Sequence, residues 1–198
     1  MLKKRRNEKR MCDKLRELNG KRPENFSTDL RKLPINIDKI LLDNGIDIFS
    51  VEFDMLEKSL PIKDLLITGM AYAKGDDLRI LSAKGLQEVD RRFTLAHELG
   101  HCCAHMKPTH SCHIELQTNY DMLGNQNQKI EIINVKKEEE ADAFARNLLI
   151  PKELLLCLLS ERNDFTIEEL SEMFMVPIKQ MEKRMEDLFN DVSSRSRV

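Results

Sequence analysis

RRFTLAHELGHCCAH, residues 91–105, carries the most informative pattern in the sequence. Its centre, HELGH at 97–101, has the form HExxH, and its apolar periodicity predicts a helix over 92–105. Residues four apart on a helix lie one turn apart and about 40° apart around the axis, so the imidazoles of His97 and His101 can reach a single ion. Histidine nitrogens bind tetrahedral Zn²⁺ at about 2.0–2.1 Å. The spacing therefore predicts a zinc site on this helix.

Glu98, between the two histidines, has a different predicted role. It lies beside the ligands rather than among them, so it can act as a general base that takes a proton from water and passes it to a leaving amine. This order of residue types is typical of zinc-dependent peptide hydrolysis. The composition of the chain produces a chance HExxH match with a probability of roughly 1%, so the motif alone is suggestive. A catalytic zinc site also needs a third protein ligand.

A third histidine does not complete the site. In the longer HExxHxxGxxH class it would fall at Lys107, and Ala104 stands where that class has glycine. His105 lies a further turn along the same helix, too far along the axis to join the same ion easily, and is predicted to be structural or to support a ligand. A glutamate from a second helix is the remaining standard solution.

The segment KKEEEADAFARNLLIP, residues 136–151, offers three consecutive glutamates for this role. At 100° per residue, Glu138 lies about 50° from the centre of the apolar stripe of the helix, Glu140 about 110° and Glu139 about 150°. Glu138 is therefore predicted to face inward as the third ligand, and the other two to face outward. Asp142, one turn beyond Glu138, is placed to hydrogen-bond the outer nitrogen of a ligand histidine.

The two segments together resemble the ImmA/IrrE family of metallopeptidases. The resemblance rests on RRFTLAHELGHCCAH and on E-x-E-A-D-x-F-A-x-x-L-L-I-P at 138–151. It extends over roughly residues 35–190, through the strand pair ITGMAYAKGDDLRILSA and the helix-turn-helix-like LSEMFMVPIKQMEKRMEDL. The resemblance implies a zincin-like fold in which His97, His101 and Glu138 hold the metal.

The resemblance also implies a substrate class. Proteins of this family act on DNA-binding repressors, often of phages or mobile elements, and cleavage relieves repression. The expectation for this chain is a zinc metallo-endopeptidase that acts in transcription regulation, with a repressor-type protein as its substrate.

The whole sequence predicts an α+β fold in three parts. These are a basic N-terminal segment at 1–33, a zincin-like domain with a small twisted sheet at 34–160, and a small helix-turn-helix-like C-terminal module at 161–198. Thr166 and Glu169 have capping-box spacing and predict the start of a helix. The predicted strands are 46–53, 67–73 and 78–83, and the predicted helices beside the one at 92–105 are 35–43, 135–149, 152–160, 167–174 and a last one from 178.

Residues 106–133 are predicted to be an irregular polar connection, of the kind that forms a functional or mobile loop. His110, His113 and Tyr120 lie in it and are the candidates for contacting the substrate or stabilising the oxyanion. The strand at 78–83 is expected to pair with an extended substrate, as exposed sheet edges do.

The five cysteines raise a second metal question. Cys102, Cys103 and Cys112, with the histidines around them, could form a structural zinc site, although their spacing matches no paired CxxC pattern. The other interpretation is that these residues are buried thiols and loop histidines. A third interpretation is that Cys112 or His113 approaches the active metal and moderates its reactivity.

Composition bears on the compartment and the partners. The net charge is −2, and the basic N-terminus lacks the apolar core of a secretory signal. No stretch reaches the roughly 18 apolar residues of a membrane span, so a cytoplasmic protein is expected. Residues 1–22 carry ten basic and three acidic side chains. Such a segment is either a solvated helix or frayed end, or a docking arm for an acidic partner or nucleic acid.

Charge also bears on the C-terminal helices. Residues 161–198 carry nine acidic and six basic side chains, a net charge of −3, whereas a DNA-binding module should be basic. Direct nucleic-acid binding is therefore not expected. Two alternatives stay open: a non-catalytic regulator that binds a repressor and keeps the metal only for structure, and a helix-turn-helix DNA-binding protein.

Overall fold

Strands and helices are mixed along the chain, as the α+β prediction requires. The computed structural model describes residues 17–18, 20–26, 32–59, 66–74, 77–106, 111–117 and 135–195. In chain order the elements are η1 (Pro23–Asn25), α2 (Ile37–Asp43), β1 (Asp47–Val51), α3 (Asp54–Ser59), β2 (Leu66–Lys74), β3 (Asp77–Ala83), α4 (Glu88–Ala104), β4 (Ser111–Gln117), α5 (Val135–Leu149), α6 (Lys152–Glu161), α7 (Ile167–Phe174) and α8 (Ile178–Arg195).

Local signals in the sequence account for several helix ends. The side chain of Asn36 accepts a hydrogen bond from the backbone N–H of Lys39 at 2.9 Å and starts α2, which ends just before Gly45 with its φ of 69°. α7 starts with the predicted capping box. There the Thr166 hydroxyl accepts from the Glu169 N–H at 3.1 Å, and the Glu169 carboxylate accepts from the Thr166 N–H at 2.9 Å. Both helix starts satisfy backbone donors that would otherwise lack partners.

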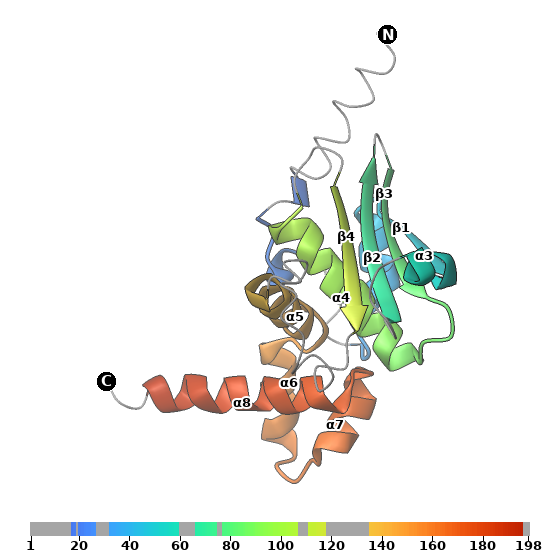
Figure 1. Ribbon diagram of the computed structural model, residues 1–198. Coiled ribbons are helices and arrows are strands. Elements are labelled where there is room, and N and C mark those ends of the chain that lie inside the picture. Colours follow the sequence, from blue (N-terminus) through green and yellow to red (C-terminus); the bar gives the residue numbers. More distant parts are fainter. Residues whose placement is uncertain are drawn as a thin grey trace, which may run out of the picture.

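The strands form one four-stranded sheet in the order β1-β3-β2-β4 (Figure 1). β2 and β3 form the predicted antiparallel hairpin, and β1 pairs with β3 in parallel. β3 is therefore an inner strand, and the expectation that residues 78–83 pair with a substrate is wrong. Both of its edges already bond to neighbouring strands. The outer strands of this sheet are β1 and β4.

β4 corrects the prediction of an irregular connection over residues 106–133. Residues 111–117 pair antiparallel with β2 and extend the sheet by one strand. The signal was present in SCHIELQ, where Cys112, Ile114 and Leu116 alternate with polar residues at the period of a strand. Only three apolar residues carry that pattern, and the polar residues around it obscured it.

α4 lies against one face of the sheet and forms the centre of the core. The residues of β2 and β3 that face it are at most 1% exposed; they include Ala71, Ala73, Leu78 and Ile80. α5 packs on α4, so α4 is covered by other elements along most of its length. A smaller cluster around Phe53 and Ile67 covers the opposite face of the sheet, beside α3. This arrangement buries the helix that carries the HExxH sequence.

α7 and α8 join the same core rather than forming a separate one. Leu170, Phe174, Val176, Met181 and Leu188 belong to the hydrophobic cluster that also contains the buried residues of α4 and α5.

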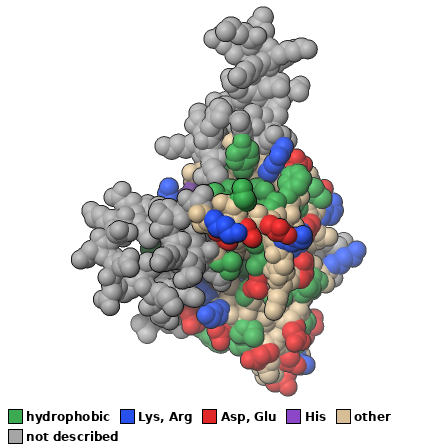
Figure 2. Space-filling view, turned by 45° about the vertical axis from the view of Figure 1, so that its right-hand side comes forward, with side chains coloured by type: hydrophobic (Ala, Val, Ile, Leu, Met, Phe, Trp, Pro, Cys, Tyr) green, Lys and Arg blue, Asp and Glu red, His purple; other side chains and the backbone are tan. Residues whose placement is uncertain are grey.

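On the face drawn in Figure 2, hydrophobic and charged side chains are interspersed, and acidic side chains gather at the lower end, where Figure 1 places α7. The predicted domain boundaries and the helix-turn-helix-like character of this region stay predictions.

Two buried arginines attach these helices to the rest of the fold. Arg92 of α4 donates to the carbonyl of Ile35 at 2.7 Å and to that of Met175 at 3.2 Å. Burial lowers the pKa of its guanidinium. Arg184 of α8 donates to the carbonyl of Ile150 at 3.0 Å. Each guanidinium satisfies backbone carbonyls next to a helix end, which stabilises the packing of the helices.

The basic N-terminal segment is described only in part. Leu18 and Phe26 are buried in the main core, at 2% and 4% exposed. Residues 1–16, with most of the predicted basic helix, lie outside the described residues. Of the helices in the described residues, none has both the length and the apolar character needed to cross a bilayer.

Candidate metal centre

The two histidines of the HExxH sequence face each other on the buried side of α4. Every residue from Arg92 to Cys103 is buried, and the side chains of His97 and His101 are 4% and 0% exposed. Their Nε2 atoms lie 3.0 Å apart. The one-turn spacing in the sequence produces this approach, because both rings leave the same face of the helix.

Glu138 brings a carboxylate from α5 to the same point. Its Oε2 atom lies 3.2 Å from His97 Nε2 and 3.3 Å from His101 Nε2. Among the described residues, these three are the one set of His, Cys, Asp or Glu side chains arranged to hold a metal ion. Ligand atoms about 2.0–2.1 Å from a tetrahedral ion lie about 3.3 Å from one another. The separations of 3.0–3.3 Å therefore suit one tetrahedral ion.

The hydrogen bonding of His97 also suits a cation at this point. Its Nδ1 atom lies 2.8 Å from Asp142 Oδ1, and a carboxylate there requires the proton to sit on Nδ1. In the neutral imidazole, Nε2 then carries a lone pair directed at the Glu138 carboxylate. Lone pairs that meet at hydrogen-bond distance repel each other, and a bound cation turns that repulsion into attraction.

Glu98 lies on the helix between the two histidines and is 0% exposed. It does not belong to the converging ligand set. A carboxylate next to a candidate ligand histidine is of the residue type that serves as a general base in proton transfer. The structure thus separates Glu98 from the three side chains that converge, as the HExxH order predicts.

Gly100 sets the distance between α4 and α5, and sequence analysis did not single it out. A Cβ atom at this position would lie 3.1 Å from the Ala141 Cα, 3.2 Å from the Ala141 carbonyl oxygen and 3.2 Å from the Phe144 Cβ. The missing side chain lets the two helices approach closely enough for Glu138 to reach the histidines. Small residues at 100 and 141 are typical of closely packed helices. They could not be paired from the sequence, because the contact between the two helices is visible only in the structure.

The structure places the other charged candidates outside the cluster. Glu139 and Glu140 are exposed, as the helical phase predicts. His105 Nε2 lies 3.5 Å from Glu140 Oε2, and the His105 ring stacks at a tilt against His101 with centroids 5.2 Å apart. His105 thus contacts a ligand histidine without joining the ligand set.

Cys102 and Cys103 are buried free thiols. Burial raises the pKa of the Cys102 thiol well above its ordinary value and that of Cys103 to about 12. Cys102 donates a hydrogen bond to the sulfur of Met106 at 3.5 Å. Neither thiol belongs to the set of side chains that converge to hold a metal ion in the described part of the chain. The interpretation as buried thiols accounts for these two residues.

The remaining predicted contacts fall outside what the structure describes. Tyr120 and His110 are not among the described residues, and for His113 and Cys112 only the backbone of β4 is described. Their predicted roles at the oxyanion or near the metal stay predictions.

Comparison with known proteins gives one family. Residues 70–186, more than half of the chain, match the family model Peptidase_M78, described as the IrrE N-terminal-like domain. A search of curated proteins gave no match. The matched region contains all of α4 and α5, and with them His97, His101 and Glu138. The ImmA/IrrE resemblance is thereby confirmed, and the chain belongs to the Peptidase_M78 family with its IrrE N-terminal-like domain.

Proposed function

We propose that this chain is a zinc-dependent endopeptidase in which His97, His101 and Glu138 hold the metal. The observation that carries the proposal is the convergence of two imidazole nitrogens and one carboxylate oxygen within 3.0–3.3 Å of one another. Three protein ligands leave one tetrahedral position open, which distinguishes a catalytic zinc site from a structural one. Membership of a peptidase family supports the same reaction class.

The proposed chemistry divides the work among the side chains. A bound zinc ion acts as a Lewis acid that makes water acidic enough to lose a proton near neutral pH. Glu98 accepts that proton as the oxygen attacks the peptide carbonyl carbon. It then donates the proton to the amine nitrogen as the C–N bond breaks. Asp142 accepts the hydrogen bond from His97 Nδ1, at 2.8 Å, and so keeps Nε2 available as a ligand.

The proposed substrate is a cytoplasmic DNA-binding repressor, and it is supported only by the family resemblance. The sheet offers an edge for such a substrate in extended form. β4 is an outer strand and contacts α4, the helix of the proposed site. An extended peptide can add to an exposed strand through backbone hydrogen bonds, which give affinity without much sequence preference. β4 therefore takes the place of residues 78–83 as the proposed docking strand.

The test compares three full-length proteins in cells that contain the native regulators: wild type, Glu98→Gln and Glu88→Gln. The last is a matched control, because Glu88 lies on the same helix but is exposed and pairs with Arg91. Zinc content of the purified proteins and new protein N-termini in the cells are both measured. Wild type and Glu88→Gln should carry one zinc and generate new N-termini. Glu98→Gln should carry zinc and lose the cleavage by about 10²–10⁴-fold, the usual contribution of a general base.

Two results would contradict the proposal. Wild-type protein that takes up no stoichiometric metal would exclude the site. Zinc-loaded wild type and Glu98→Gln with the same cellular effect and no new N-termini would indicate a regulator that only binds its partner.

A further inference from the structure

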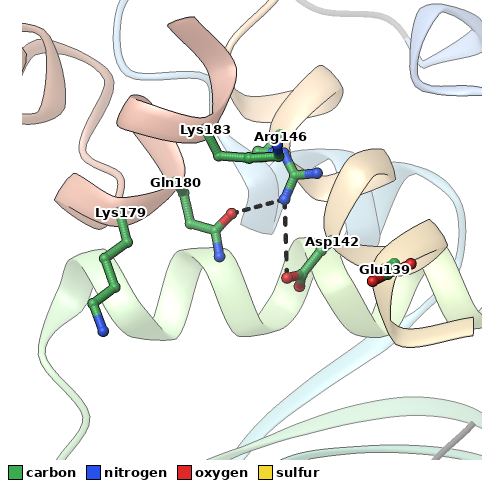
Figure 3. Close-up of a pocket in the computed structure, with 6 residues that line it drawn as sticks. All are labelled: Glu139, Asp142, Arg146, Lys179, Gln180 and Lys183. Atoms are coloured by element: carbon green, nitrogen blue, oxygen red, sulfur yellow. Dashed lines mark hydrogen bonds and ion pairs between the residues drawn. The ribbon is translucent and has the colours of Figure 1, made fainter. Parts of the chain in front are cut away.

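α5 and α8 enclose a polar cleft next to the proposed metal site. Its volume is about 520 Å³. Figure 3 shows Arg146 at its centre, between Asp142 on the same helix and Gln180 on α8. The lining residues are Glu139, Asp142, Arg146, Lys179, Gln180 and Lys183. One wall of this cleft is thus the aspartate that bonds to His97.

Arg146 is held by contacts from both helices. Its Nη1 atom donates to Gln180 Oε1 at 3.0 Å, and its Nε atom lies 3.7 Å from Asp187 Oδ2. The same Nη1 atom lies 3.9 Å from Asp142 Oδ2. The Arg146 side chain is only 11% exposed, whereas that of Asp142 is 35% exposed. The guanidinium is therefore the better fixed member of the pair.

The two oxygens of Asp142 face different partners. Oδ1 accepts from His97 Nδ1 at 2.8 Å, and Oδ2 faces the guanidinium. A partly exposed carboxylate with one partner can rotate towards water, but a second, fixed partner opposes that rotation. The connection then runs from α8 through Gln180 to Arg146, and on through Asp142 to His97.

We propose that Arg146 is a positioning residue for the metal site, which acts through Asp142 and is held in place by α8. The inference rests on the proposed function, because it requires that His97 binds a metal ion. It gives α8 a part in the site although α8 supplies no ligand. Lysine at this position would keep a positive charge within reach of Asp142, four residues earlier on the helix, but would lose the planar fork that also reaches α8.

The experiment measures the zinc dissociation constant of the full-length protein by competition with a coloured chelator. Replacement of a residue that directly supports a ligand weakens metal binding by about 10–100-fold, and Asp142→Ala should fall in that range. Arg146 contacts Asp142 rather than a ligand histidine, so Arg146→Ala should weaken zinc binding by about three- to tenfold. Arg146→Lys should weaken it by less than Arg146→Ala does. Gln180→Ala, which removes the hydrogen bond between Arg146 and α8 but leaves the Asp187 contact, should also weaken binding. The absorption spectrum of the cobalt-loaded proteins reports the same changes as altered ligand geometry.

A double variant separates positioning from general stability. If Arg146 acts through Asp142, Arg146→Ala should cause no further loss of zinc affinity in an Asp142→Ala background. Arg184→Ala is the matched control, because Arg184 is a buried arginine of α8 that bonds to the backbone of Ile150. It should lower the free energy of unfolding of the metal-free protein and leave zinc affinity within about twofold.

Two results would overturn the inference while leaving the proposed function intact. In the first, wild type binds one zinc and cleaves its substrate, and Arg146→Ala and Gln180→Ala both bind zinc as tightly as wild type does. The other is an effect of Arg146→Ala that persists in full without Asp142. A wild type that binds no zinc would instead contradict the proposed function itself.

Discussion

The two faces of α5 show different ways of holding a functional group. Towards α4, Ala141 and Ala145 are at most 1% exposed, and a methyl group at Gly100 would lie only 3.1 Å from the Ala141 Cα, which is closer than an ordinary van der Waals contact. Towards α8, the same helix meets its neighbour through charged side chains around a cleft of about 520 Å³. The first interface is close-packed and the second is polar and open.

The close-packed interface is the one that fixes the positions of the ligand atoms. Three ligand atoms can converge only if the backbones of α4 and α5 are fixed to within a fraction of an ångström, and close packing of small residues provides that. Unlike Arg146, which is 11% exposed, the exposed charged side chains of the cleft keep several alternative partners and can adjust, so single replacements of those exposed residues should cost little.

The largest expected effect concerns the ligand at the α4–α5 interface. Glu138→Gln replaces the carboxylate ligand by a neutral amide, and stoichiometric zinc binding should be lost. Glu139→Gln, the same change one residue later on the exposed side of α5, should leave zinc binding at the wild-type level. Metal analysis of the purified proteins after dialysis measures both. Equal zinc content in the two variants would show that α5 does not supply the ligand.

A smaller effect is expected where the two helices touch. Gly100→Ala gains up to about 1 kcal/mol of helix propensity. Overpacking typically costs about 1–3 kcal/mol. The contacts are backbone atoms of Ala141 and the Cβ of Phe144, which cannot rotate away, so the cost should exceed the gain. The free energy of unfolding in urea should fall by about 1–2 kcal/mol, and zinc affinity should fall with it.

Ala104→Ser provides the reference for this change. Ala104 lies on the same helix but is exposed, so its replacement should change stability by no more than about 0.5 kcal/mol. If Gly100→Ala is as stable as this reference and binds zinc as tightly, the interface can accommodate a methyl group. The contrast between the two faces of α5 would then be wrong.

The smallest effect is expected on the α8 side. Lys183 pairs with Glu186 at 3.1 Å and with Asp187 at 3.6 Å, and its side chain is 49% exposed. Its pKa is raised, chiefly by the hydrogen bond that its ammonium donates to the Glu186 carboxylate. Exposed ion pairs contribute little because water screens them. Lys183→Ala should therefore destabilise the protein less than Gly100→Ala and leave zinc affinity unchanged, as measured by the same urea and chelator titrations. A loss of zinc affinity as large as that of Gly100→Ala would remove the distinction.

The site was more predictable from the sequence than the sheet was. The spacing of His97 and His101 and the helical phase of Glu138 are properties of single helices. α5 has the predicted bounds, whereas α4 begins at Glu88, four residues before the predicted start at 92, and ends at Ala104. β4 was missed because its three alternating apolar residues lie in a polar stretch. The substrate edge was misplaced because strand order depends on which distant segments pair, and no local pattern states that β1 lies beside β3.

Local sequence patterns predict which side chains share a helix face, where several helices begin and end, and which of three glutamates faces inward. These follow from backbone geometry within one element, which depends only on neighbouring residues. The distance between α4 and α5, the inner position of β3 and the contacts of Arg146 with Asp142 and Gln180 are visible only in the folded protein. These depend on contacts between residues far apart in the chain, and such contacts are selected by how whole elements pack together.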